Sequence, residues 1–271
     1  MDLGLKDKVA IVTGGGRGIG RQISLILAEE GAKVAVNDFY EDRANSVVDE
    51  IKQANGLAIP IQADLTVIEQ TNAMVKKVAD EWGRIDILCN TAGNAGIVDR
   101  SKARGLGGKF MDMDPNNWSQ WVNVNFYGVL NCTRGVLDYM VSQKYGKIVN
   151  TISDAGRVGE PRQSVYSGAK AGVVGFTKAI AKELGSSCIN VNCVAPGATY
   201  TEATLGRYES RTDTQKEREQ ELYRVYPLGR GLQRLGKPED VANMVVFLVS
   251  DRAEWITGQV ISVSGGYSMA G

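Results

Sequence analysis

The chain has 271 residues, 43% of them hydrophobic, with 31 basic and 31 acidic side chains and no histidine. A net charge of zero gives no electrostatic reason to expect nucleic acid or an anionic membrane as a main partner. No apolar run approaches the roughly eighteen residues that a membrane helix needs, and the first residues, MDLGLKDK, do not resemble a signal peptide. We therefore expect a compact cytoplasmic protein that binds neither nucleic acid nor a membrane.

The four cysteines, Cys89, Cys132, Cys188 and Cys193, show no CxxC or finger-like spacing. Without histidine, a zinc site would need cysteine or carboxylate ligands alone. We expect no metal, and free buried thiols of the kind found in a reducing compartment.

In chain order, apolar β-branched runs alternate with amphipathic stretches. The pattern predicts strands at 8–13, 33–37, 57–62, 85–89, 147–152, 189–194 and 259–263, and helices at 18–30, 41–54, 67–82, 115–143, 164–185 and 238–250. Repeated strand–helix units predict an α/β fold, a single doubly wound Rossmann-type parallel sheet with helices on both faces. Without a linker or repeat, residues 1–271 are expected to form one domain, with substrate loops at about 94–114 and 199–235.

The first strand, helix and second strand have the order of a dinucleotide-binding unit. Residues 8–13 (KVAIVT) lead into a glycine-rich turn with the spacing Gly14-xxx-Gly18-x-Gly20 and then an amphipathic stretch. Such a turn lets the backbone approach a pyrophosphate at a helix amino end; the alternative is a merely flexible turn. Asp38, at the end of the second strand, is placed to bond ribose hydroxyls and favours NAD, unless it only caps the next helix. Arg17 argues for the 2′-phosphate of NADP instead.

A second pattern lies in YSGAK, where Tyr166 and Lys170 are four residues apart with Ser153 thirteen residues upstream. Residues i and i+4 share one helix face, so an ammonium can lie near a phenol whose pKa is ordinarily ~10. A nearby cation favours the phenolate and lowers that pKa. In a chain without histidine, this pair is a candidate proton carrier, although an ordinary amphipathic face gives the same spacing.

Taken together, the motifs resemble those of the short-chain dehydrogenase/reductase family, in its single-domain branch, over essentially the whole chain. They are TGGGRGIG (13–20), AD (63–64), NTAG (90–93), VNFYG (124–128), the set Ser153…Tyr166-xxx-Lys170, and PG (196–197) followed by Thr201. The chain departs from the family where Thr91 replaces the second asparagine of NNAG and where VDGG becomes VSGG (263–266).

The resemblance implies a role for each matching position. Tyr166 would be the general acid/base, Lys170 would lower its pKa and bind the nicotinamide ribose, and Ser153 would hydrogen-bond the substrate oxygen. Asn125 would hold a water in a relay from Lys170 to solvent and completes the expected catalytic set. Asp64 would contact adenine and Thr201 the nicotinamide carboxamide. The expected cofactor-binding residues are Gly14, Arg17, Gly18, Ile19, Gly20, Asp38, Asp64, Leu65, Asn90, Ala92, Gly93, Tyr166, Lys170, Pro196, Gly197 and Thr201.

The expected function is an NAD-dependent oxidoreductase that interconverts a secondary alcohol and a ketone, working as a homotetramer on a small-molecule substrate. A hydroxyacyl-CoA thioester is one candidate, because segment 99–109 carries Arg100, Lys102, Arg104 and Lys109 and could hold phosphates or be only a solvated loop. A cyclic or aromatic alcohol under an apolar lid (Tyr200, Leu205, Tyr208, Leu222, Tyr223, Tyr226) is another. The alternatives are a non-catalytic dinucleotide sensor, or a nucleotide-sugar epimerase or dehydratase. An enoyl reductase would be expected to have a longer Tyr-to-Lys spacing.

Overall fold

The computed structural model describes residues 1–93, 109–201 and 223–269. Within these ranges seven parallel strands form one sheet in the order β3-β2-β1-β4-β5-β6-β7. In chain order they are β1 (Val9–Thr13), β2 (Lys33–Asp38), β3 (Leu57–Gln62), β4 (Ile87–Asn90), β5 (Gly146–Thr151), β6 (Ile189–Pro196) and β7 (Val260–Val263). The predicted doubly wound α/β fold is confirmed. The strand order reverses between β1 and β4, where such sheets bind ligands.

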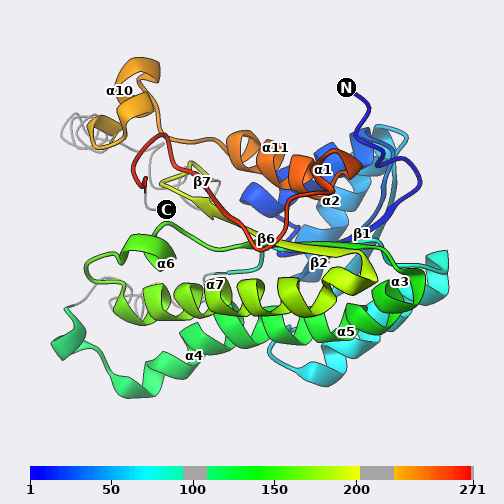
Figure 1. The fold of residues 1–271 in the computed structure, drawn as a ribbon, viewed down its shortest axis with the longest axis horizontal. Coiled ribbons are helices and arrows are strands. Elements are labelled where there is room, and N and C mark those ends of the chain that lie inside the picture. Colours follow the sequence, from blue (N-terminus) through cyan, green and yellow to red (C-terminus); the bar gives the residue numbers. More distant parts are fainter. Residues whose placement is uncertain (94–108, 202–222, 270–271) are drawn as a thin grey trace.

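Helices cover both faces of the sheet (Figure 1). On one face lie α1 (Gly18–Glu29), α2 (Glu41–Gln53) and α11 (Pro238–Leu248), and on the other α3 (Ile68–Trp82), α5 (Gly128–Gln143) and α7 (Ser164–Leu184). Every residue of β1, β5 and β6 is buried, because parallel strands need cover on both faces. This cover explains the apolar run of β1, whereas β5 and β6 also bury polar side chains that are hydrogen-bonded, such as Lys147 to Asn190 at 2.7 Å.

The helix expected over 115–143 is interrupted. The chain makes a 3-10 turn at Pro115–Asn117, then α4 (Trp118–Val122), a π-helical segment at Asn123–Tyr127, and only then α5. A π turn adds a residue without changing the apolar pattern much, so periodicity does not reveal it. The short helices α6 (Ala155–Val158) and α10 (Pro227–Leu232) also escape prediction, because neither is long enough to show a helical period.

All four cysteines are free. Burial is confirmed for Cys89, Cys132 and Cys193 and raises the pKa of the Cys89 and Cys132 thiols to about 12. The expectation is wrong for Cys188, which is exposed in the turn before β6, outside the core.

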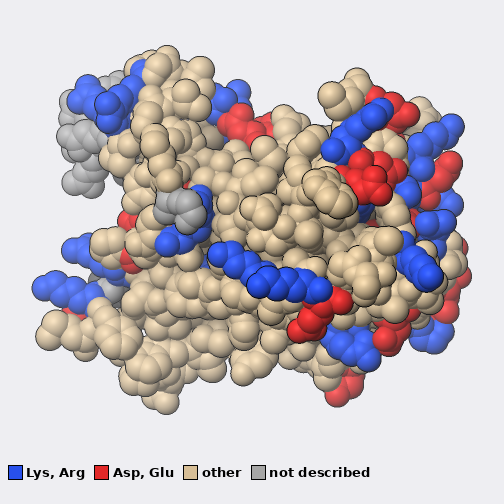
Figure 2. Space-filling view, in the orientation of Figure 1, with Lys and Arg blue, Asp and Glu red and all other residues tan. Residues whose placement is uncertain are grey.

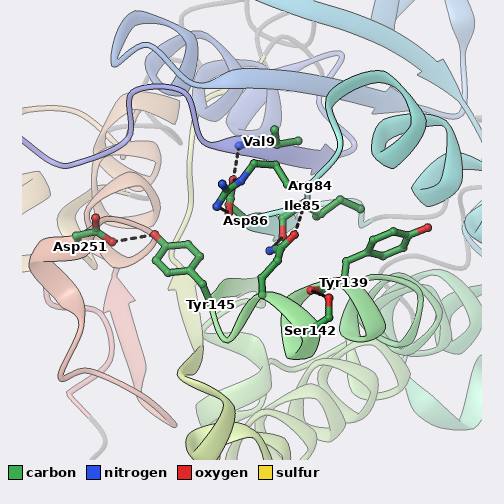
Figure 3. A network of polar contacts seen from close by, with 9 residues as sticks. Val9, Arg84, Ile85, Asp86, Tyr139, Ser142, Tyr145 and Asp251 are labelled. Atoms are coloured by element: carbon green, nitrogen blue, oxygen red, sulfur yellow. Dashed lines mark hydrogen bonds and ion pairs between the residues drawn. The ribbon is translucent and has the colours of Figure 1, made fainter.

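A polar clasp, made by Asp86, Arg84, Tyr145 and Asp251, ties the amino ends of the strands together (Figure 3). The fully buried carboxylate of Asp86 accepts from the Val9 amide at 2.9 Å and from the Arg84 guanidinium at 2.8 and 2.7 Å. The Tyr145 hydroxyl donates to Asp251 at 2.8 Å. The bonds of Asp86 join β1 to the segment before β4, and the bond of Tyr145 joins the start of β5 to the segment before β7. Both sets lie at the edge opposite the strand carboxyl ends.

The face shown in Figure 2 carries acidic and basic side chains interspersed at the end where α2 and α3 lie. Such a mixture gives that face no strong field of one sign. Within the described ranges, none of the helices has both the length and the apolar character needed to cross a bilayer.

Candidate active site

The glycine turn after β1 forms a cradle that side chains would fill. Gly14 and Gly18 have positive φ values of 60° and 55°. A Cβ on Gly14 would lie 2.8 Å from the Ala92 Cα, and one on Gly20 would run into the Gly14 carbonyl oxygen. The turn opens onto the amino end of α1, whose free N–H groups attract an anion. The cradle therefore fits the pyrophosphate of a dinucleotide.

Asp38 lies on the other side of this turn. Its carboxylate accepts from the Gly16 amide at 3.2 Å and the Tyr40 amide at 3.1 Å, with 6% of the residue exposed. A Cβ on Gly16 would meet both the Asp38 carboxylate (2.8 Å) and the Arg43 Cβ (2.6 Å). The Arg43 guanidinium lies 4.1 Å from the centre of the Tyr40 ring. Asp38 thus braces the turn, and Arg43 approaches the same glycine from α2.

The cradle continues into a cleft of about 640 Å³ along the strand carboxyl ends. Its wall includes sixteen of the predicted residues: Gly14, Arg17, Gly18, Ile19, Gly20, Asp38, Asp64, Leu65, Ala92, Gly93, Ser153, Tyr166, Lys170, Pro196, Gly197 and Thr201. Residues from seven separate segments therefore meet at one edge of the sheet, as the strand-end rule predicts.

Ser153, Tyr166 and Lys170 lie together in this cleft. The Ser153 hydroxyl, in the turn between β5 and α6, accepts from the Ala155 amide at 3.2 Å and is hydrogen-bonded to the Tyr166 hydroxyl. The ammonium of Lys170, on α7 with Tyr166, donates to the Thr151 carbonyl at 2.9 Å. These contacts place two hydroxyls side by side in the cleft, where both can reach one substrate oxygen, with an ammonium one helical turn away.

The pKa directions correct one expectation. Burial raises the pKa of the Tyr166 phenol, opposed by its bond to Ser153, whereas the Tyr-xxx-Lys pattern predicts a lowered pKa. The Lys170 nitrogen lies 5.9 Å from the centre of the Tyr166 ring and is itself turned toward a carbonyl. Burial lowers the pKa of Lys170 to about 8. Both groups therefore carry less charge near neutrality than the sequence suggests.

Asn125 lies behind the cleft wall, buried in the π-helical segment. Its side-chain nitrogen donates to the Trp121 carbonyl at 2.9 Å. A Cβ on Gly93 would lie 3.2 Å from the Asn125 side-chain oxygen and 3.3 Å from the Lys170 nitrogen. The side chains of Asn125 and Lys170 thus flank Gly93, and a larger residue there would crowd both.

The side chain of Asn90 does not line the cleft, contrary to expectation. It is 2% exposed, and its amide donates to Asn150 at 2.8 Å and Thr133 at 3.3 Å. The reason is the alternation of a strand: as the last residue of β4, Asn90 points into the layer beneath the sheet. Its oxygen has no partner among the described residues.

Several cleft residues were not predicted. Thr151 contributes a backbone carbonyl, for which no side-chain motif exists, and its hydroxyl lies 3.4 Å from that of Thr91. Arg43 and Tyr40 also line the cleft; their i, i+3 spacing at the start of α2 was the available signal. The expected adenine ligand Asp64 lines the cleft while its carboxylate accepts from the Thr66 amide and hydroxyl at 2.9 and 2.8 Å.

The expected substrate loops fall largely at 94–108 and 202–222, outside the described residues. Of the basic residues in segment 99–109, only Lys109 is described, and it is exposed. Of the expected apolar lid, Tyr200, Tyr223 and Tyr226 are described; Tyr223 is buried and the Tyr226 hydroxyl accepts from the Ala198 amide at 3.2 Å. No cluster of carboxylates and thiols suited to a metal ion occurs in the described part of the chain.

Comparisons with known proteins cover nearly the whole chain. A family model described as enoyl-(acyl carrier protein) reductase matches residues 14–268. A 3-oxoacyl-(acyl-carrier-protein) reductase of Thermotoga maritima is 40% identical over 262 residues, 97% of this chain and 98% of its own. A (2S)-[(R)-hydroxy(phenyl)methyl]succinyl-CoA dehydrogenase subunit of Thauera aromatica is 38% identical over 268 residues, 98% of this chain and 99% of its own.

Proposed function

The chain belongs to the short-chain dehydrogenase/reductase family, as an NAD(P)-dependent oxidoreductase, and we propose that it interconverts the secondary alcohol and ketone of an acyl thioester with NAD. The observation that carries the proposal is the meeting of Ser153, Tyr166 and Lys170 in the cleft that holds the glycine cradle. An enoyl reductase is less favoured, because it would be expected to space its tyrosine and lysine further apart.

In the proposed mechanism, Tyr166 moves the proton. The bound nicotinamide supplies or accepts the hydride. During alcohol oxidation the Tyr166 phenolate takes the hydroxyl proton, and during reduction the phenol returns it to the growing alkoxide. Ser153 donates a second hydrogen bond to that oxygen and stabilises its charge. The hydrogen bond between the two hydroxyls sets them side by side for this task.

Lys170 has two proposed roles: it binds the ribose of the nicotinamide, and it places a positive charge in the site. Its pKa of about 8 leaves it mostly protonated at neutral pH. The Thr151 carbonyl holds the ammonium through one donor, and an ammonium has two more. Asn125 on the far side of Gly93 would pass a proton onward through water. Because the phenol pKa is raised by burial, the cofactor's positive ring is expected to supply the remaining pull toward phenolate.

NAD is favoured over NADP by the position of Asp38. Its buried carboxylate is fixed by two backbone amides, so it cannot turn away from a 2′-phosphate and would repel it. Arg17 and Arg43 line the same end of the cleft and would favour the phosphate once the acid is removed. Asp38→Ala should therefore shift preference toward NADP, and Asp38→Ala with Arg43→Ala should lose much of that gain. Unchanged selectivity in Asp38→Ala would refute this role.

The substrate proposal is supported by what the two relatives' names share. A 3-oxoacyl group and a hydroxy(phenyl)methyl substituent on succinyl-CoA both place the reacting oxygen on the carbon β to an acyl carbonyl. We therefore propose a 3-hydroxyacyl or 3-oxoacyl thioester rather than a simple cyclic alcohol. A non-catalytic sensor is disfavoured because each catalytic position of the family pattern is filled and three of the four side chains line one cleft.

The test is nicotinamide absorbance with purified protein, NAD and NADP in parallel, over hydroxyacyl-CoA thioesters, their carrier-protein forms, cyclic alcohols and nucleotide sugars. Turnover of β-oxygenated thioesters, lost in a Tyr166→Phe variant that still binds NADH, is expected. Tight NAD binding with no turnover of any class would favour the sensor, and equal rates for Tyr166→Phe would refute the mechanism.

We also propose a cytoplasmic homotetramer. Tyr127 and Val141, at 51% and 43% exposure, leave apolar surface on α5 and the π-helical segment before it, and we propose that this surface packs between subunits. Light scattering at micromolar concentration tests the assembly, and a monomer would count against it.

A further inference from the structure

Trp121 contacts two of the four residues in the proposed catalytic set. Its ring meets the Tyr166 ring edge-on, with centroids 6.2 Å apart and planes at 81°, and its carbonyl accepts from the Asn125 amide at 2.9 Å. This distance and angle are typical of a favourable aromatic pair. Trp121 is only 5% exposed and covers one side of the Tyr166 ring, whereas Tyr166 itself is partly exposed where it lines the cleft.

The local structure explains why the ring points at Tyr166. Helix α4 packs against α7, which carries Tyr166, and Gln120 and Asn123 on either side of Trp121 line the cleft. Trp118, one turn earlier, stacks instead on Phe110 at 5.5 Å. The two tryptophans of this short helix thus have different partners, and the partner of Trp121 is the proposed proton carrier Tyr166.

The Tyr166 side chain is therefore held by three groups. Ser153 bonds the hydroxyl, the Lys170 nitrogen lies 5.9 Å from the ring centre, and Trp121 meets the ring. Lys170 is a charged group that lies near the Tyr166 ring on the same helix. Hydroxyl and ammonium contacts leave the ring plane free to tilt, whereas an edge-to-face neighbour resists tilting and excludes water.

We propose that the indole of Trp121 is a positioning residue that fixes the plane of the Tyr166 ring and keeps its surroundings dry. This inference rests on the proposed function, since it assigns Trp121 to the same proton transfer. Removing the indole should loosen the phenol and admit water. Since burial raises the Tyr166 pKa, that pKa should then fall, and alcohol oxidation should begin at lower pH but with a lower maximum rate.

The experiment compares Trp121→Leu, Trp121→Phe and the matched control Trp118→Leu, which alters the same helix away from Tyr166. The Asn125 side chain donates to the backbone carbonyl of residue 121, which every one of these substitutions keeps. The changes therefore test the ring alone. We expect Trp121→Leu to lower kcat roughly tenfold with little change in the KM for NAD. Trp121→Phe should recover most of the loss, and Trp118→Leu should behave like the wild type.

A second readout needs neither substrate nor cofactor. The tyrosinate absorbance of each protein, minus that of its Tyr166→Phe counterpart, gives the Tyr166 titration, which should move to lower pH in Trp121→Leu only. Melting temperatures show whether each variant folds. Equal kcat and equal titrations for the two leucine variants would overturn the proposal, as would a loss of kcat in Trp121→Leu with an unmoved titration. Absence of turnover in the wild type would instead refute the proposed function.

Discussion

Replacing Lys170 with methionine should show how much the buried, charged ammonium lowers the free energy of unfolding. Burial lowers its pKa from an ordinary 10.5 to about 8. Each pKa unit corresponds to about 1.4 kcal/mol, so keeping Lys170 protonated in the folded protein costs about 3 kcal/mol. Methionine removes this cost but leaves the Thr151 carbonyl without its donor, which opposes the gain by about 1–3 kcal/mol. At pH 7 the variant should be as stable as the wild type or slightly more stable.

The pH dependence is the sharper result. Below pH 8 the wild type carries the full cost. As the pH rises from 8 to 10.5, the folded protein loses the Lys170 proton while the unfolded chain keeps it, so wild-type stability gains about 3 kcal/mol relative to the variant.

Urea unfolding of both proteins between pH 7 and pH 10, followed by tryptophan fluorescence at fixed protein concentration, measures this difference. Lys178→Met, which removes an exposed lysine of the same helix, controls for effects of charge alone. A difference between Lys170→Met and wild type that stays flat across this range would refute the reasoning.

Further substitutions test the packing and the edges of the sheet. Gly156→Ala would place a Cβ 2.7 Å from the Lys170 Cβ on α7, and it should reduce activity at least tenfold and lower the melting temperature. Gly168→Ala, with no described atom within 4 Å of the new Cβ, should raise the free energy of unfolding by about 0.5–1 kcal/mol. Asp86→Ala should cost about 1–3 kcal/mol in urea unfolding, because the buried Val9 amide loses its acceptor while the half-exposed Arg84 turns to water. Asp80→Ala, which removes an exposed helix pair, should leave the urea midpoint almost unchanged. Gly20→Ala should abolish NADH binding, measured by fluorescence, while circular dichroism stays unchanged; normal binding would contradict the cradle.

The sequence predicts the sheet well because each strand is a short run between amphipathic segments, and the inner strands are buried. The same regularity places Asp38 and Ser153 at the strand carboxyl ends, so their meeting in one cleft follows from topology. Asn90 shows the limit of that argument: a strand end fixes the backbone at the rim, but the alternation of side chains turns its amide into the layer below.

Features that depend on exact backbone path were not predictable. The π-helical segment around Asn125 and the carbonyl of Thr151 that holds Lys170 leave no trace in residue types. The Tyr166 pKa depends on burial and on where the Lys170 ammonium turns, which spacing alone does not give. Arg43 does not follow Asp38 directly but reaches the cleft from the first turn of α2, so the residue after the acid gives no sign of it.

The clasp of Asp86 and Tyr145 has a consequence for how such an enzyme diversifies. It ties the chain at the amino ends of the strands, opposite the edge that carries the proposed active site. Residues that stabilise the fold and residues that select the substrate therefore lie in different parts of the chain. The loops that follow the strand carboxyl ends can then be exchanged between relatives without loss of these bonds. Chimaeras that keep the clasp of the parent and take these loops from a relative should retain the parent's melting temperature and acquire the relative's substrate range.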